Sequence, residues 1–459
     1  MTGSRAWRYL LMALVALAAL RLAGFVATFG GESLQMDFSA FYTAGEALNA
    51  GLSPYESHIL ASPPIWDGID RYQHSRFLYP PLVATLFQPV AHLPYHVAKV
   101  AWMIVGLLAL FGALFLSLRL VGVRLTEPAA WITWLVALTF HPLLTFLERG
   151  QIDSLTLLLL TGGIALLCTR RREGTAGLLI AAATLLKLHT VLLLPFLVLR
   201  RRRRALAGYA IGGVLILILS LIFNGPALLL DYLTVEFPRI SRYGEGGTPE
   251  MLVDPAVIAD LQPGEGLTVK QGRVYRHESF AFVSNASLGR TRTGYRLQEH
   301  LTAAGLPSAQ TVASLVFFAL LFAIVALLHR WASPRDHVDP TYDLIYWHLA
   351  LVIVLLSAPL TWVMNTIWLL TLTPLLVREF SSPRPPARRI ALTLVGLGLA
   401  IAALPDHLAF PRLFPPGTVG ETAWQKYVIA QLLVALGLAG CLLPGAQRER
   451  HTAEVASRD

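Results

Sequence analysis

The chain has 459 residues, of which 55% are hydrophobic and 14% are charged, and its mean hydropathy is +0.58. A soluble domain has to cover itself with polar side chains, so this composition excludes a soluble protein and indicates a multi-span membrane protein. The net charge of +9 does not indicate nucleic-acid binding, because the basic residues stand in short clusters between apolar runs, where retention on the cytoplasmic side explains them.

Apolar segments long enough to cross about 30 Å of hydrocarbon recur along the chain. The first runs from Trp7 to about Phe29 and lacks a convincing cleavage site, so we expect a retained span rather than a signal peptide. Cys168 and Cys441 lie inside such runs and do not indicate a disulfide framework. The expected spans are 7–29, 98–118, 130–147, 154–169, 205–223, 311–329, 342–358, 365–377, 390–404 and 425–443.

The apolar segment 174–199 stands between two arginine clusters, Arg170–Arg172 and Arg200–Arg204. A single crossing would place one cluster outside, against the positive-inside rule. We therefore expect the segment to enter from the cytoplasm, turn at Lys187–Thr190 and return as two half-helices. Each arm has about 12 residues, or ~18 Å of helix, which is shorter than the hydrocarbon core.

Two long polar segments, 30–97 and 224–310, fall outside in this topology, and the tail 446–459 falls in the cytoplasm. Segment 30–97 is expected to hold two amphipathic helices, the second starting after Pro80–Pro81. Within 224–310, the sequence LTVKQGRVYRH, residues 267–277, predicts a short β-hairpin that turns at its Gln-Gly pair.

The turn of the expected half-helix hairpin brings Lys187 and His189 to membrane depth. An ionisable side chain is costly there, so Lys187 is a candidate functional residue with an anion as its expected partner. Two alternatives stay open, namely that Lys187 snorkels to the interface or forms a structural pair with an acid such as Asp153. Arg149 and Gln151, in the loop before Asp153, would line the same cavity if that loop is more than a polar connector.

Asp37 opens a stretch in which apolar residues recur at helical spacing. Because Asp is a preferred N-cap, these residues alone favour an amphipathic helix on the outer surface that is capped by Asp37. The residues at helical spacing are Phe38, Phe41, Tyr42, Gly45 and Leu48.

Six stretches, MDFSAFYTAGEALNAGLSPYE (36–56), FLYPPLVATLFQPVAHLP (77–94), ERGQIDSLTLLLL (148–160), GLLIAAATLLKLHTVLLLPFLVLRRRR (177–203), SNASLGR (284–290) and SAPLTW (357–362), follow one another along the chain. In this order they resemble the signatures of polyprenyl-phosphate-sugar-dependent glycosyltransferases of the GT-C superfamily. More narrowly, they resemble glycosyltransferase family 87, which contains polyprenol-phosphate-mannose-dependent α-(1,2)-mannosyltransferases. The resemblance covers about 7–376, and the segment beyond Arg378 shows only generic spans.

This resemblance implies one GT-C-like membrane domain over residues 1–459, an all-α bundle of about 12 membrane segments including the half-helix hairpin. It implies a bacterial plasma-membrane enzyme with an extracytoplasmic active site, which moves one sugar from a polyprenyl-phosphate donor to a lipid or glycan acceptor. We expect no metal, no other cofactor and no nucleic-acid partner, because side chains can neutralise a lipid monophosphate leaving group. The long loop 224–310 is expected to bind the acceptor.

Members of the superfamily have an acidic catalytic base in the first extracytoplasmic loop, and Asp37 matches that position. A positioned carboxylate can accept the proton of the attacking hydroxyl. A single displacement on a β-linked sugar phosphate inverts the anomeric carbon and gives an α-glycoside. Lys187, His189 and Arg149 are the candidates for binding the donor phosphate. The candidates for binding substrate are Tyr42, Tyr79, Gln151, Asn285, Trp362 and Asn365.

The chain departs from the family pattern after Trp362. Many relatives have histidines there, whereas this chain has Val363, Met364 and Asn365. If those histidines contact the donor, then Asn365 or His189 has to replace them, and the identity of the sugar stays open.

A polytopic lipid or glycolipid transporter is the alternative function. It would also have many spans, a broken-helix hairpin and a charge at membrane depth. Inverted repeats would favour it, but the outer loops are unequal in length and the half-helix pair occurs once.

Overall fold

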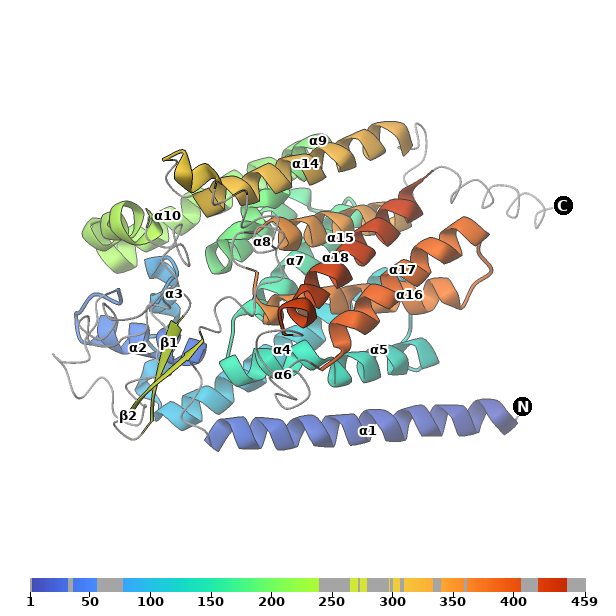
Figure 1. The fold of residues 1–459 in the computed structure, drawn as a ribbon, viewed down its shortest axis with the longest axis horizontal. Helices are drawn as coiled ribbons and strands as arrows, with labels where there is room; N and C mark the ends of the chain where they lie inside the picture. Colours follow the sequence, from blue (N-terminus) through green and yellow to red (C-terminus); the bar gives the residue numbers. More distant parts are fainter. Residues whose placement is uncertain are drawn as a thin grey trace.

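The computed structural model is a bundle of helices with a smaller layer of short helices and one β-hairpin at one end (Figure 1). The helix α1 lies along one side of the bundle and α14 along the opposite side, with α15 to α18 between them (Figure 1). The structure describes residues 2–31, 36–55, 77–238, 265–270, 273–278, 297, 300–305, 309–332, 340–358, 361–405 and 420–443.

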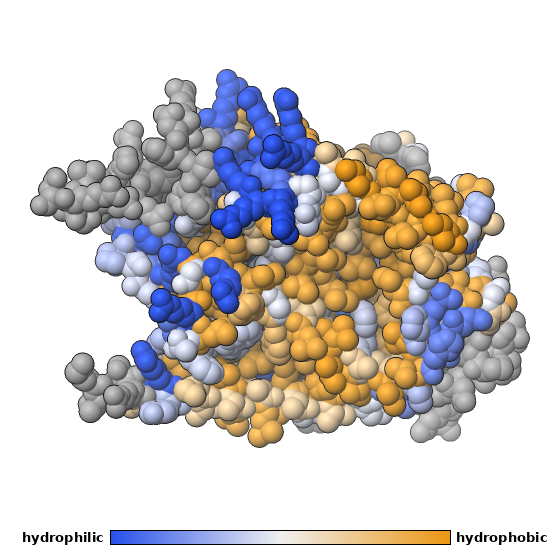
Figure 2. Space-filling model, turned by 180° about the vertical axis from the view of Figure 1, so that it is seen from behind, coloured by the Kyte–Doolittle hydropathy of each residue, from blue (hydrophilic) through white to orange (hydrophobic). Residues whose placement is uncertain are grey.

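Five of the described helices are long and apolar enough to cross a membrane. Their surfaces expose large apolar residues such as Leu17, Ile222 and Leu327, which are 64%, 68% and 67% exposed. Seen from behind, the molecule carries a broad apolar band, with hydrophilic side chains toward its two ends (Figure 2). The predicted class, a multi-span helical membrane protein, is confirmed. The five helices are α1 (Thr2–Gly31), α4 (Tyr95–Leu120), α10 (Arg203–Asp231, continued by the π-helical turn η4, Tyr232–Glu236), α14 (Ala309–Ala332) and α17 (Pro386–Ala403).

Shorter apolar helices complete the bundle. Among them are α7 (Asp153–Cys168), α15 (Pro340–Ser357) and α18 (Gly420–Leu442), of which α18 leaves Ile429 and Leu436 exposed. α15 is buried along most of its length, which explains why a helix of 18 residues can consist almost entirely of apolar side chains.

Two expected spans are interrupted. The span 130–147 consists of α5 (Pro128–Thr139) and α6 (His141–Arg149), which are bent by 54°. The cause is Pro142, which lacks an N–H group and whose ring would clash with a carbonyl one turn earlier in a continuous helix. The span 365–377 starts as the 3₁₀ helix η7 (Val363–Leu372) and becomes α-helical only in α16 (Thr373–Phe380).

The half-helix hairpin predicted for 174–199 is confirmed. It consists of α8 (Glu173–Leu186), the 3₁₀ helix η3 (Leu188–Leu193) and α9 (Leu194–Leu199), with Lys187 in an extended conformation between the arms. Glu173 and Arg202, one at each end of this segment, form an ion pair of 2.6 Å. Because both ends meet, the chain returns to the side from which it entered.

Backbone contact fixes the hairpin against α10. A Cβ atom added to Gly177 would lie 1.9 Å from the carbonyl oxygen of Ala205, and one added to Gly208 would lie 2.0 Å from that of Gly174. Small residues allow two membrane helices to approach this closely. The hairpin and the first half of α10 therefore form one rigid unit.

The layer at the end of the bundle contains α2 (Met36–Asn49), α3 (Pro81–Phe87) and the 3₁₀ turn η2 (Val90–His92) (Figure 1). The helix α2 forms where it was expected, but it is not a surface helix with one exposed face, because residues 38–45 are all buried, with Phe38 and Phe41 completely so. Phe41 stacks on Phe87 with a centroid distance of 4.8 Å. Gly45 allows this contact, because a Cβ there would meet the carbonyl oxygen of Phe87 at 2.6 Å.

The predicted β-hairpin is also present. β1 (Glu265–Lys270) and β2 (Arg273–Glu278) pair antiparallel, with Glu265 opposite Glu278 and Lys270 opposite Arg273. The pairing of Lys270 with Arg273 agrees with the predicted hairpin, and the Gln-Gly pair itself lies outside the described residues.

Candidate active site

A cluster of charged and polar side chains lies where α2, the loop between α6 and α7, the turn of the hairpin and the start of η7 meet. Contacts connect residues that are far apart in the sequence, among them Asp37, Arg149, Lys187 and Asn365. Asp37, Asp153, Lys187 and Tyr79 are also close enough for their charges to interact. The structure therefore brings most of the predicted site residues together.

Asp37 lies in the first turn of α2, where a negative charge interacts favourably with the helix dipole. Its Oδ2 is 3.6 Å from Nη1 of Arg149, the last residue of α6. The side chains of Asp37 and Arg149 are 15% and 20% exposed, so both groups remain accessible from outside the bundle. Asp37 is therefore a carboxylate with a cationic neighbour at the edge of the cluster.

Lys187 lies deeper in the cluster. It pairs with Asp153, as expected in one of the two alternatives to a functional role. Its Nζ is 3.3 Å from Oδ2 of Asp153, whose side chain is fully buried. The same Nζ donates a hydrogen bond of 3.3 Å to Oε1 of Gln151. The extended backbone at Lys187 ends α8 and directs its side chain toward this loop, which explains why the helix breaks there.

Tyr79 closes the other side of Lys187. Its hydroxyl donates to Oε1 of Gln151 at 3.3 Å, and its ring centroid lies 5.8 Å from the Lys187 ammonium. Burial raises the pKa of Tyr79 to about 12, although the Lys187 charge opposes this shift, so the phenol stays protonated and remains a donor. The hydroxyl of Tyr55 donates to the carbonyl oxygen of Tyr79 at 2.7 Å and fixes the loop.

Asn365 is fully buried, and both ends of its amide are used. Its Oδ1 accepts the N–H of Trp362 at 2.6 Å, and its Nδ2 donates to Oδ1 of Asp153. Asn365, one of the two residues expected to replace the missing histidines, therefore holds Asp153, which in turn holds Lys187. Direct contact with a substrate would require Asn365 to give up these bonds.

The remaining predicted residues have different surroundings. Tyr42 is buried between Phe38 and Tyr95, and its hydroxyl donates to the carbonyl oxygen of Leu93 at 2.7 Å, so it packs the outer layer. Asn285 lies outside the described residues. The ring of His189 lies 5.5 Å from that of Trp368, and within the described part of the chain its buried Nε2 has no hydrogen-bond partner.

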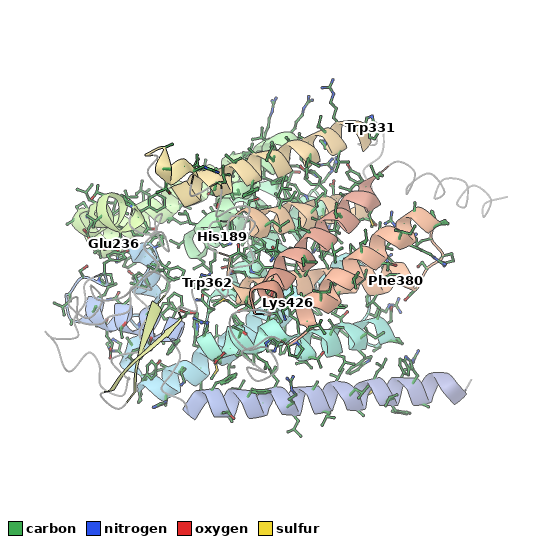
Figure 3. All side chains as sticks on the ribbon, in the orientation of Figure 1. His189, Glu236, Trp331, Trp362, Phe380 and Lys426 are labelled. Carbon is green, nitrogen blue, oxygen red and sulfur yellow. The ribbon has the colours of Figure 1, made fainter. Side chains whose placement is uncertain are left out.

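Trp362 precedes η7 and is partly buried against the apolar core. Figure 3 shows Trp362 and His189 from different elements, both on the side of the bundle toward α2 and α3. This is the end at which the polar cluster lies.

The loop between α6 and α7 is shaped by Gly150, which ends α6 in the left-handed conformation, with φ 64° and ψ 43°. Glycine is favoured at such a position because it has no Cβ. The indole N–H of Trp102, on α4, donates to the carbonyl oxygen of Gly150 at 2.8 Å. Trp102 was not identified from the sequence, because nothing in a run of apolar residues indicates a bond to a loop 48 positions later.

Taken together, the fold and this cluster define a multi-span helical membrane protein with a carboxylate, cations and amides gathered at one end of its bundle. Residues 77–262 match the model of glycosyltransferase family 87. The matched segment contains Tyr79, Arg149, Gln151, Asp153 and Lys187, and thus the centre of the cluster.

Two characterised relatives carry the same name, polyprenol-phosphate-mannose-dependent alpha-(1-2)-phosphatidylinositol pentamannoside mannosyltransferase. The protein from Mycobacterium tuberculosis is 26% identical over 365 residues, which cover 78% of this chain and 71% of that protein. The protein from Mycolicibacterium smegmatis is 31% identical over 114 residues, which cover 24% of this chain and 26% of that protein. The chain is therefore a membrane glycosyltransferase, and the family that it matches is glycosyltransferase family 87.

Proposed function

We propose that the chain transfers a single sugar from a polyprenyl-phosphate donor to a lipid or glycan acceptor, with inversion and with Asp37 as the general base. The observation that carries this proposal is the position of Asp37, an accessible carboxylate at the edge of a cluster that also holds two cations. The name of the M. tuberculosis relative makes mannose the first sugar to test and a mannosylated phosphatidylinositol the first acceptor.

In this mechanism the Asp37 carboxylate accepts the proton of an acceptor hydroxyl as its oxygen attacks the anomeric carbon. The bond between that carbon and the phosphate oxygen breaks on the opposite face, so a β-linked donor gives an α-glycoside. A base in position contributes about 100- to 10,000-fold to such a step. The first turn of α2 holds the carboxylate in place, and the Arg149 guanidinium lies 3.6 Å from it.

The departing polyprenyl phosphate gains negative charge, which has to be stabilised. Arg149 is the more accessible of the two cations, since its side chain is 20% exposed and that of Lys187 is 10% exposed. Its guanidinium can turn from Asp37 to the phosphate and bind two oxygens at once. This exchange would free the carboxylate for catalysis when the donor is bound, while Lys187 stays held by Asp153.

The cluster is proposed to face the extracytoplasmic side, because the exposed arginines of the hairpin lie at its other end. Cysteine substitution tests this placement. A cysteine at Leu188, which is 46% exposed near the turn, should react with an impermeant thiol reagent in intact cells. A cysteine at Arg171 should react only after permeabilisation, and the reverse pattern would put the cluster in the cytoplasm.

The transferase itself is tested with purified protein in liposomes. Radiolabelled polyprenyl-phosphate mannose and other polyprenyl-phosphate sugars are supplied with phosphatidylinositol mannosides or a membrane extract, and the products are identified by mass spectrometry. We expect a glycolipid product with one added α-linked sugar. Movement of a lipid across the bilayer without a new glycosidic bond would support the transporter instead.

A further inference from the structure

The base of the half-helix hairpin carries two arginine-rich loops, residues 169–172 before α8 and residues 200–202 before α10. The ion pair between Glu173 and Arg202 and the backbone contact at Gly208 hold the two loops side by side. Two of the arginines point inward. Arg200 and Arg202 both pair with the buried carboxylate of Asp343, and Arg200 also lies over the ring of Tyr346 at 5.2 Å.

Six other arginines on these loops and on the first residues of α10 are exposed. Among the residues that the structure describes, none of the six has an ion pair. The inward-facing ion pairs therefore hold together the two loops and the start of α10, here called the arginine platform, which carries six exposed guanidinium groups. The exposed residues are Arg170, Arg171, Arg172, Arg201, Arg203 and Arg204.

Three of the platform arginines have a left-handed backbone. Arg170, Arg172 and Arg201 have φ values of 53°, 52° and 53°. Arg170 and Arg201 follow the last turns of α7 and α9, and their N–H groups donate to the carbonyl oxygens of Leu167 and Val198, as at other helix C-termini. These caps fix the ends of the two loops and leave the arginine side chains exposed.

The residue type and the surroundings indicate the ligand. All six cations are arginines, and the planar guanidinium binds phosphate oxygens in pairs, which a lysine ammonium does not. Exposed apolar residues lie on both sides of the platform in the sequence: Val198 precedes Arg200 by two residues and Ile211 follows Arg204 by about two turns of α10, and they are 60% and 57% exposed. Figure 2 shows hydrophilic side chains bordering the apolar band. If a phospholipid binds the arginines through its phosphate, its acyl chains would lie along the apolar band.

We propose that this arginine platform is a binding site for anionic phospholipid, with headgroup phosphates on the guanidinium groups and acyl chains against Val198 and Ile211. The site is separate from the polar cluster at the hairpin turn and does not depend on the transferase mechanism. Its ligand holds the two loops together and so stabilises the hairpin from its base.

Native mass spectrometry of the purified full-length protein tests the proposal, with phosphatidylglycerol as the probe and phosphatidylcholine as the neutral comparison. We expect retained phosphatidylglycerol, and at least about tenfold weaker retention in the triple variant Arg170→Gln, Arg201→Gln, Arg204→Gln, since each arginine near an anionic surface contributes severalfold. The matched control is Arg124→Gln, Arg378→Gln, Arg389→Gln, which removes the same charge from exposed arginines elsewhere. Equal losses in both variants would overturn a specific site.

Two further measurements complete the test. Glycerol 3-phosphate should not displace the lipid, and displacement at equal concentration would assign the site to a free phosphate ester instead. Arg201→Gly removes one guanidinium and suits the left-handed backbone, so in phosphatidylcholine nanodiscs its melting temperature should equal or exceed that of the wild type, while phosphatidylglycerol should stabilise it less. If phosphatidylglycerol stabilises this variant as much as the wild type, Arg201 does not hold the lipid phosphate and the proposal fails.

Discussion

The turn and the base of the half-helix hairpin both contain buried ion pairs, but the two differ in how accessible their charged groups are to a substrate. At the base, Arg202 binds the carboxylates of both Asp343 and Glu173. At the turn, Lys187 has one carboxylate, Asp153, together with the neutral amide of Gln151 and the ring of Tyr79. Each end has as many carboxylates as cations, because Arg202 shares Asp343 with Arg200. The two ends therefore differ in access: at the turn, Arg149 and Asp37 remain partly exposed and can exchange partners with a bound substrate.

The largest effect is expected for Asp37→Asn, in the polar cluster at the turn of the hairpin. The amide keeps the shape of the side chain but cannot accept a proton, so transfer should fall about 100- to 10,000-fold. The rate is measured with labelled donor at matched amounts of folded protein. Asp231→Asn makes the same chemical change outside the cluster and should leave the rate unchanged. Normal turnover by the Asp37 variant would restrict Asp37 to a structural role at the start of α2.

At the base, Asp343→Asn should affect stability rather than rate. The substitution leaves Arg200 and Arg202 without their shared carboxylate, and loss of one partner of a buried pair costs about 3 kcal/mol or more. The melting temperature in detergent should therefore fall, while the transfer rate per folded molecule stays near that of the wild type. A rate loss with an unchanged melting temperature would mean that the base takes part in function.

Lys187→Met should lower the transfer rate about a hundredfold, because it removes a cation beside the proposed phosphate position. The single variant also leaves Asp153 buried without its cation, so its stability should fall as well. The double variant Lys187→Met, Asp153→Asn removes both charges and separates the two effects. We expect it to recover stability but not activity, and recovery of both would show that the pair is structural.

The smallest expected effect is that of Asn365→Ala, which removes the amide that donates to Asp153. A hydrogen bond to a charged group contributes about 1.5–3 kcal/mol, so the rate should fall roughly tenfold through a less well-positioned Lys187. Steady-state kinetics should show the loss mainly in kcat. In a Lys187→Met background the same change should have little further effect. Independent, additive losses would place Asn365 in direct contact with substrate.

Much of the fold could be predicted because it depends on local patterns. Hydropathy locates the spans, and the two arginine clusters require the segment between them to return to its starting side, as the pairing of Glu173 with Arg202 shows. Alternating residues around Gln271–Gly272 predict the β-hairpin. The bend at Phe140 also had a local signal, because Pro142 stands in the sequence, but the apolar run concealed it.

The site was only partly predictable, because its contacts join distant positions. Lys187 and Arg149 were identified from charge and depth, but the bond between Asn365 and Asp153 joins residues 212 positions apart, and no periodicity records it. Tyr42, which was predicted to bind substrate, is a second example. Its hydroxyl donates to the carbonyl oxygen of Leu93, 51 positions away in the outer layer, and nothing in the sequence indicates this bond.

The glycine contacts between α8 and α10 affect how a survey of tolerated substitutions should be interpreted. Gly177 and Gly208 meet carbonyl oxygens of the opposite helix at distances that exclude even a methyl group. Alanine at either position would separate the helices and displace the turn that carries Lys187, so a screen for growth or product would rank these glycines beside the chemical residues. Loss of activity on substitution of these two glycines would show only that the two helices must lie close together. A role in the reaction would be indicated by a residue whose shape can change without loss of activity but whose charge cannot.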